Sequence, residues 1–333
     1  MLDFLKNNPL VDGARGAKLR PRNLLFHLLL FYLVEMVVRL VSAVPSIIYS
    51  TFRTVLLLGE DVLLVNDPER TEELLKKMDE LLLAVAAEDG YILTSLFSTV
   101  LMLLLVVVFC RFIERRPIAS MGLSFGRRSV AHYGLGLLAG LALISLTFLV
   151  LYLTRAIEVS SGSFSPVFLI LYLFGFLIQG AAEEVLLRGY FMVSVTNVSS
   201  PLTAVFFSAF VFTMLHVANV GISVLGILNI FLFGILLGFI VFRTRSLYLS
   251  MALHGIFNFA EGNLFGFPVS GIVTGHSLLQ STVVDGRSLT HGGAFGPEGG
   301  AALTVILLIA IAVFFLIPQK KQAEPIEGDG NAV

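Results

Sequence analysis

Charged residues and cysteine are scarce in this sequence. Of its 333 residues, 14% are Asp, Glu, Lys or Arg, and 56% are hydrophobic. Soluble domains carry about 25% charged residues, so this chain lacks the polar groups that would cover a soluble fold. Cys110 is the only cysteine, which excludes an internal disulfide framework. The net charge of −1 gives the chain no general attraction to nucleic acid.

The sequence contains long runs without Asp, Glu, Lys or Arg. A helix that spans a bilayer needs about 20 predominantly apolar residues. Residues 189–242 contain no charged side chain, and Ser199, Pro201 and Gly221 divide that run into shorter segments. The sequence therefore predicts an all-α membrane protein, a polytopic bundle of about eight transmembrane helices. The expected spans lie near residues 23–43, 91–110, 129–154, 159–182, 202–220, 223–242, 246–262 and 299–319.

The segments between these spans differ in their basic residues. Of the 22 Lys and Arg residues, 15 fall on the side that holds both termini and 6 on the other, while Arg39 lies inside a span. Lys and Arg concentrate on the cytoplasmic side of membrane proteins. We therefore predict a multi-pass integral membrane protein whose N- and C-termini are cytoplasmic.

The predicted outer segment 44–90 is acidic, with ten Asp or Glu residues and four Lys or Arg residues. Asp67-Pro68 is typical of a helix start, because Asp caps and Pro suits the first turn. Apolar side chains then recur at helical spacing, which predicts an amphipathic extracytoplasmic helix on the bundle or membrane surface. Residues 45–59 either extend the first helix or dip into the bilayer. The recurring side chains are Leu74, Leu75, Met78, Leu81, Leu82 and Val85.

Glu35 and Arg39 are the charged residues of the first predicted span. They are four residues apart, so they share one helix face and can neutralise each other. A structural pair is the first interpretation. A functional role is the second, because charges within a membrane are costly and often functional.

Polar side chains also interrupt the later spans. Successive helical side chains are rotated by about 100°, so Glu183 and Glu184 point to different faces. Glu184 and Arg188 have the spacing and order of a favourable ion pair. Glu183 is then free to face another helix.

Residues that are distant in the sequence are predicted to lie at the same depth in the membrane. Glu183 lies 17 residues before Ser200 and His216 lies 16 after it, so two helical arms from a hairpin there place both at the same height. This requires the fourth helix to continue toward residue 196. His254 and Asn258 are four apart and share one face of the seventh span. We predict that these groups meet in the cytoplasmic half of the bilayer.

Such a set of side chains suits the hydrolysis of a peptide bond. A carboxylate can take a proton from water, and an imidazole can help to hold that water. An imidazole and a carboxamide can donate hydrogen bonds to an oxyanion. A divalent metal such as Zn²⁺ is the alternative, with Glu183, His216 and His254 as candidate ligands, although no HExxH motif occurs. The residues leave metal-free and metal-assisted hydrolysis both open.

Three short motifs resemble a known family. Glu183-Glu184-x-x-x-Arg188, Phe212-x-x-x-His216 and His254-x-x-x-Asn258 resemble the signature motifs of the CPBP family of CAAX proteases and bacteriocin-processing enzymes, also called Abi. The family includes the type II CAAX prenyl endopeptidases. The resemblance implies that Glu183 is the catalytic base, with His216 as its partner on the water. It implies that His254 and Asn258 stabilise the oxyanion, and that Glu184 and Arg188 support them. Family members are often termed metalloproteases, and a glutamate mechanism without metal has also been argued.

The resemblance also sets how we divide the chain. Residues 1–160 hold the N-terminal transmembrane helices with the acidic segment 44–90. Residues 161–262 form the motif-bearing helical core. Residues 263–333 hold an extracytoplasmic loop, the last transmembrane helix and a cytoplasmic tail.

The sequence thus predicts an intramembrane endopeptidase that hydrolyses a peptide bond near the cytoplasmic leaflet. Its expected partners are a peptide or protein substrate, lipidated or not, and membrane lipid, with no nucleic acid. One alternative is a non-catalytic family member that acts as a scaffold or immunity protein. Another is a proton- or ion-coupled transporter, in which buried charged groups form a relay. Many transporters show repeated halves, and we find no such repeat.

Overall fold

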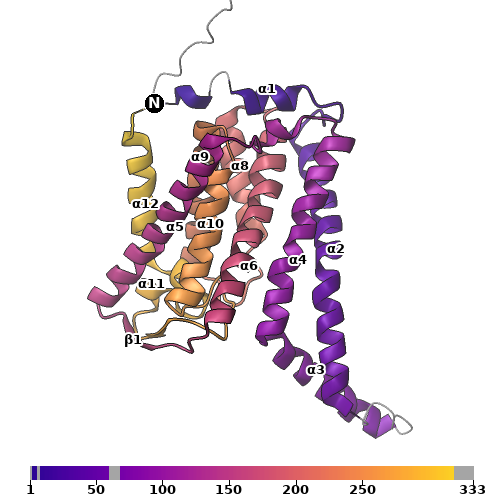
Figure 1. The fold of residues 1–333 in the computed structure, drawn as a ribbon, viewed down its shortest axis with the longest axis vertical. Helices are drawn as coiled ribbons and strands as arrows, with labels where there is room; N and C mark the ends of the chain where they lie inside the picture. The colour runs from indigo at the N-terminus through magenta and orange to yellow at the C-terminus, as the bar shows by residue number, and fades with distance from the viewer. Residues whose placement is uncertain (1, 6–7, 60–67, 319–333) are drawn as a thin grey trace, which may run out of the picture.

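Long helices that run alongside one another make up most of the chain (Figure 1). The structure is a computed structural model that describes residues 2–5, 8–59 and 68–318. The helices are α1 (Pro9–Arg15), α2 (Leu24–Leu58), α3 (Pro68–Ala86), α4 (Asp89–Val108), α5 (Arg127–Leu153), α6 (Pro166–Glu184), α7 (Val193–Val195), α8 (Pro201–Met214), α9 (Val224–Thr244), α10 (Tyr248–Phe259), α11 (Ser288–His291) and α12 (Ala301–Leu316). Short π-helical segments at Phe109–Ile113, Val185–Met192 and Ala260–Leu264 extend α4, α6 and α10.

Several of these helices have the length and composition of membrane spans. Within the described ranges, five are long and apolar enough to cross a membrane, and two more are apolar but shorter, Pro201–Met214 and Ala301–Leu316. The prediction of an α-helical membrane protein agrees with this bundle, whereas the count of eight spans stays a prediction. The five long ones are Leu24–Leu58, Asp89–Ile113, Arg127–Leu153, Pro166–Val195 and Val224–Thr244.

The first helix is longer than the predicted span. α2 begins after Asn23, whose side chain accepts a hydrogen bond from the backbone of Phe26 at 3.0 Å, as a helix N-cap does. The helix continues through Pro45 to Leu58, so residues 45–58 extend it, which was the first of the two expected arrangements. The expected ion pair between Glu35 and Arg39 is present on its surface.

α3 forms where the acidic outer segment predicted a helix, although Asp67 lies outside the described residues. Its more covered side chains recur at helical spacing, while Leu75 is 52% exposed. It packs against α2 and α4. Its place outside the membrane stays a prediction. The covered side chains are Leu74, Met78, Leu81 and Val85.

A small β-sheet includes residues that were predicted to belong to a membrane span and to a loop. The span expected at 159–182 begins too early, because Ile157–Ser161 form strand β1 and α6 starts only at Pro166, a residue pre-set for the first helical turn. β1 pairs antiparallel with β2, Leu279–Val283, inside the segment expected to be loop. The β-branched residues of both strands fit this pairing, which depends on segments more than 100 residues apart and was not foreseen.

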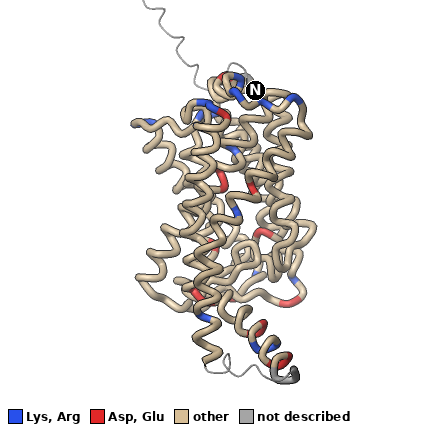
Figure 2. Tube along the Cα trace, turned by 90° about the vertical axis from the view of Figure 1, so that its right-hand side faces the viewer, with Lys and Arg blue, Asp and Glu red and all other residues tan. Residues whose placement is uncertain are grey.

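The segments predicted to share the cytoplasmic side lie at one end of the bundle. The Asn8 side chain donates a hydrogen bond to the carbonyl of Phe242 at 2.8 Å, and Leu247 N donates to Gly122 O at 3.0 Å. Lys and Arg gather at this end, whereas α3 carries charges at the opposite one (Figure 2). Which end faces the cytoplasm stays a prediction.

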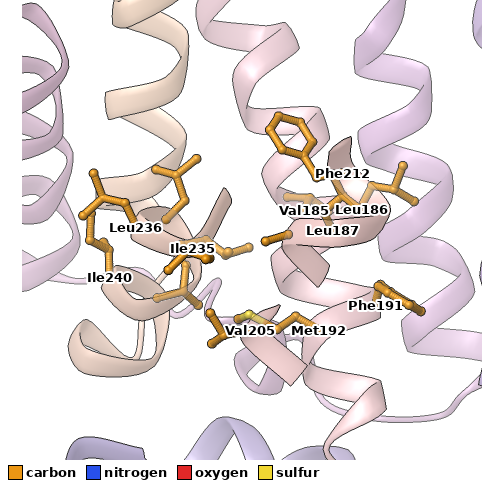
Figure 3. Close-up of a cluster of buried hydrophobic side chains, with 14 of the residues drawn as sticks. Val185, Leu186, Leu187, Phe191, Met192, Val205, Phe212, Ile235, Leu236 and Ile240 are labelled. Atoms are coloured by element: carbon orange, nitrogen blue, oxygen red, sulfur yellow. The ribbon is translucent and has the colours of Figure 1, made fainter. Parts of the chain in front are cut away.

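Apolar side chains from α8, α9 and the extension of α6 form the largest buried cluster, part of which Figure 3 shows. Val205 and Phe212 of α8 belong to this cluster, together with Leu187 and Met192 of the α6 extension and Leu236 of α9. This cluster holds α8 against the segment that carries Arg188. It therefore fixes the helices on which the motifs lie.

Candidate active site

A π-helical stretch continues the helix that carries Glu183 and Glu184. α6 ends at Glu184, the π-helix Val185–Met192 follows, and α7 completes a helical segment that runs from Pro166 to Val195. The prediction that this helix continues past Arg188 is confirmed. Such π segments often mark functional sites, because they turn side chains away from the regular helical positions.

Two glycines bring α6 and α10 into close contact. A Cβ atom on Gly180 would lie 2.6 Å from the backbone nitrogen of Gly255, closer than real Cβ contacts allow. Small residues at a helix crossing let two backbones approach. Because Gly180 precedes Glu183 by one turn and Gly255 follows His254, this crossing places the two motifs side by side.

The buried ion pair predicted between Glu184 and Arg188 is present and has a third member. Arg188 Nη1 lies 2.8 Å from Glu184 Oε1, and both side chains are fully buried. His254 Nδ1 lies 3.3 Å from the same oxygen. The guanidinium of Arg188 also stacks 4.5 Å from the ring centre of Phe212. Glu184 therefore contacts an imidazole of the site, a contact that the sequence did not reveal.

Glu183 reaches the site with one oxygen bonded and one free. Gln179 Nε2 donates to Glu183 Oε1 at 2.5 Å, and Asn258 Nδ2 donates to Gln179 Oε1 at 3.1 Å. Glu183 Oε2 lies 3.7 Å from His254 Nε2, beyond hydrogen-bond distance. No hydrogen bond to Oε2 occurs within the described chain.

His216 lies in the turn just after α8, because that helix ends at Met214 and not near residue 220 as expected. Its Nδ1 is 2.8 Å from the carbonyl oxygen of Phe212. A carbonyl only accepts hydrogen bonds, so Nδ1 carries the proton and Nε2 is the acceptor of the neutral ring. The imidazole of His254 lies 3.7 Å from the Glu183 carboxylate, and the placement of His216 on a water beside Glu183 stays a prediction.

One cavity of about 410 Å³ has all four predicted catalytic side chains in its walls. Glu183, His216, His254 and Asn258 line it, and the last two are almost fully buried. Its volume falls within the range of ligand sites in proteins. The structure thus brings together the residues that the motifs singled out, while their roles stay a prediction.

Two further cavity residues were missed by the sequence reasoning. Gln179 had a signal, since it is a polar residue in an apolar span four positions before Glu183. Glu298 had none, because it lies in a glycine-rich segment without periodicity. Its carboxylate accepts hydrogen bonds from the backbone and the hydroxyl of Ser270, both at 2.6 Å. Burial raises the pKa of the Glu298 carboxyl, and these hydrogen bonds oppose the shift.

The candidate metal ligands do not form a metal site. Within the part of the chain that the structure describes, no group of three or more His, Cys, Asp or Glu side chains is arranged to hold a metal ion. Protein zinc sites use at least three such ligands. Both ring nitrogens of His254 face carboxylates, and Nδ1 of His216 is bonded to Phe212. In this arrangement Glu183, His216 and His254 are not grouped as zinc ligands are, and the choice between metal-free and metal-assisted hydrolysis stays a prediction.

Comparison with known protein families finds a match to the part of the chain that carries the three motifs. A family model described as type II CAAX prenyl endopeptidase Rce1-like matches residues 165–260. The match covers less than a third of the chain and includes all three motifs. It bears out the resemblance to the CPBP family and indicates a protease associated with the membrane. No curated protein and no solved structure matches the chain.

Proposed function

We propose that this chain, which resembles the type II CAAX prenyl endopeptidases over residues 165–260, is an intramembrane endopeptidase that hydrolyses its substrate in the cavity between α6, α8 and α10. One observation carries the proposal. The Glu183 carboxylate has one oxygen held by Gln179 and the other without a hydrogen bond to the described protein, beside His254. A carboxylate held in this way can serve as a base toward water.

Glu183 Oε2 takes a proton from a water molecule, and the oxygen of that water attacks the carbonyl carbon of the scissile peptide bond. His216 helps to position the water, because its Nε2 is an acceptor when Nδ1–H donates to Phe212. The hydrogen bond from Gln179 holds the carboxylate so that Oε2 remains the free oxygen.

His254 and Asn258 stabilise the charge that develops on the carbonyl oxygen. They are one turn apart on α10 and both line the cavity. Asn258 uses one amide proton on Gln179 and keeps a second for the oxyanion. Nδ1 of His254 faces the Glu184 carboxylate, which orients the ring so that Nε2 faces the cavity. Glu183 returns its proton to the leaving amine, and the peptide bond breaks.

Glu184 and Arg188 act as positioning residues. Arg188 neutralises the buried carboxylate, and the carboxylate holds the imidazole of His254 by Nδ1. Second partners of this kind fix which ring nitrogen carries a proton. His254 is thus the second partner of Glu184, beside Arg188.

We further infer the arrangement of the chain in the membrane. α2, α4, α5, α6, α8, α9, α10 and α12 form eight spans, with both termini in the cytoplasm and the cavity in the cytoplasmic half of the bilayer. The substrate is a peptide or protein, lipidated or not. Cysteines introduced at Leu75 and at Phe125, after Cys110 is replaced, should label from opposite sides of sealed vesicles. Labelling of both from one side contradicts this topology.

The function is tested by comparing new peptide termini in membranes that carry the wild-type protein and membranes that carry Glu183→Ala. We expect cleavage of specific substrates with the wild type, lower by about 10²–10⁴-fold in the variant, with unchanged thermal stability. Purified protein should keep its activity in the presence of a strong chelator. Equal cleavage by both proteins contradicts the assignment of Glu183, and loss of activity with chelator contradicts the metal-free step.

A further inference from the structure

The turn that carries His216 packs against a distant part of the chain. This His216 turn, residues 215–223, connects α8 to α9 and has no regular helix. A Cβ atom on Gly271 would lie 2.3 Å from the carbonyl oxygen of Val220, so the two backbones are in close contact. Gly271 lies outside residues 165–260, which match the family model. The position of His216 therefore depends on a segment that the three motifs do not include.

A chain of hydrogen bonds joins the His216 turn to Glu298. Asn219 Nδ2 donates to the carbonyl oxygen of Ser270 at 3.2 Å. The backbone N–H and the hydroxyl of Ser270 both donate to Glu298 Oε2, each at 2.6 Å. The side chain of Asn229 in α9 donates to the backbone carbonyl of Glu298 at 2.8 Å. Glu298 is thus held by α9 and in turn holds the residue that contacts the His216 turn.

The backbone of Ser270 depends on this hold. Its φ angle is 48°, a left-handed conformation that is uncommon for residues other than glycine. Such conformations persist where the surrounding structure fixes them, and they are frequent at functional sites. Because Glu298 Oε2 accepts from both the N–H and the hydroxyl of Ser270, it fixes the residue on two sides. Without this acceptor, Ser270 is free to relax and to release Asn219.

Every side chain of this network faces the cavity. Asn219, Ser270 and Glu298 line it together with His216. A reactive side chain is held in place by neighbours whose own positions are fixed by packing and hydrogen bonds. The network supplies such neighbours for His216, whose ring nitrogen Nδ1 is already bonded to Phe212.

We propose that Glu298 is a positioning residue of the peptidase site, which fixes the His216 turn through Ser270 and Asn219. This inference rests on the proposed peptidase function and adds a residue outside the three motifs. Loss of the Glu298 carboxylate leaves His216 attached to α8 but displaced from the water that it positions. Such a displacement acts on the chemical step, so kcat falls while KM changes little.

Hydrogen exchange of residues 213–222 tests the positioning without turnover. The full-length protein in nanodiscs is compared with Glu298→Met, which removes both acceptor oxygens, and with Glu298→Gln, which keeps one for Ser270. We expect exchange in this segment to be about tenfold faster or more in the Met variant and close to wild type in the Gln variant, because a lost hydrogen bond favours local opening. Equal exchange in all three proteins overturns the proposal.

Kinetics of the same variants separate positioning from substrate binding. Glu298→Met should lower kcat by about 10–100-fold with little change in KM, since small displacements at a reacting centre cost that much. Glu298→Gln should recover most of the lost kcat. A raised KM with unchanged kcat in both variants would show that Glu298 binds the substrate. Equal loss of kcat in both would assign the effect to its charge, and either result overturns the hydrogen-bond route.

Ser223→Ala is the control for a general loss of stability. Ser223 Oγ donates to the carbonyl oxygen of Gly299 at 3.2 Å and caps α9, so it ties the same segments together, but it does not line the cavity. The variant should lower the melting temperature and leave kcat near wild type. If Glu298→Met does not fold, Ser270→Ala removes one of the two donors and should change exchange and kcat in the same direction. Wild-type exchange and kcat in Ser270→Ala then overturn the proposal.

The exchange measurement separates this inference from the proposed function. Faster exchange of residues 213–222 in Glu298→Met, restored in Glu298→Gln, shows that Glu298 holds the His216 turn even if no cleavage is found, in which case the peptidase proposal fails alone. Cleavage that depends on Glu183 but is unchanged in Glu298→Met overturns the positioning role while the peptidase proposal stands.

Discussion

Two Glu–Arg pairs in this chain have the same spacing and opposite surroundings. Glu184 and Arg188 are fully buried, 2.8 Å apart, at the helix crossing that carries the motifs. Glu35 and Arg39 lie on α2, where the arginine side chain is 61% exposed and lines the cavity. Spacing of four residues predicts the contact in both cases but not its environment. We therefore expect loss of the first pair to lower stability more than loss of the second.

The largest expected effect follows from breaking the buried pair. Arg188→Met leaves the carboxylate of Glu184 buried without its cation, which should lower the free energy of unfolding by about 3–5 kcal/mol. Arg39→Met is the matched comparison and should cost less, because the side chain of Arg39 is 61% exposed, although that of Glu35 is only 10% exposed. Thermal unfolding of both variants in the same detergent measures the difference. Equal losses would remove the distinction between the two pairs.

Replacement of both members of the buried pair separates stability from activity. Glu184→Met combined with Arg188→Met leaves no unpaired buried charge, so stability should return close to the wild-type value. Activity should stay about tenfold or more below wild type, because His254 loses the partner of its Nδ1. A double variant with full activity would show that Glu184 does not position His254.

The sequence predicted local contacts well and distant ones poorly. Glu184 and Arg188 are on one helix, so their pairing follows from helix geometry alone. The contact of Glu184 with His254 joins residues 70 positions apart and depends on the close approach of Gly180 to Gly255. Charge-free runs predicted the long apolar helices, because a helix that crosses lipid needs about 20 apolar residues. The motifs predicted which helices contribute the polar side chains of the cavity.

Segments without periodicity were the ones that sequence reasoning could not place. Two hydrogen bonds place Glu298 at the cavity. The Asn229 side chain donates to its backbone carbonyl at 2.8 Å, and the backbone N–H of Ser270 donates to its carboxylate. Strands β1 and β2 form through pairing across more than 100 residues. Neither feature leaves a local pattern, since each depends on how the later segments fold back onto the bundle.

A smaller effect should come from Gln179, whose side chain donates a hydrogen bond to Glu183, the proposed catalytic base. Gln179→Met removes the donor to Glu183 Oε1 at similar volume, so kcat should fall by about tenfold, with little change in KM. Ile178→Met is the control, because Ile178 does not line the cavity. A KM effect from Gln179→Met would mean that Gln179 contacts the substrate instead of the base.

The smallest expected effect is the coupling energy of the Glu35–Arg39 pair, in which the arginine alone is exposed. A double-mutant cycle on Glu35 and Arg39, each changed to Gln, should give about 0.2–1 kcal/mol, because water and ions reach the guanidinium. Screening should lower this value further between about 0.05 M and 1 M salt, since the Debye length falls to about 3 Å at 1 M. The coupling between Glu184 and Arg188 should not change with salt, because neither side chain is exposed. If the coupling of Glu35 and Arg39 were also independent of salt, Arg39 would be closed off from the aqueous cavity. The two pairs would then differ in position alone.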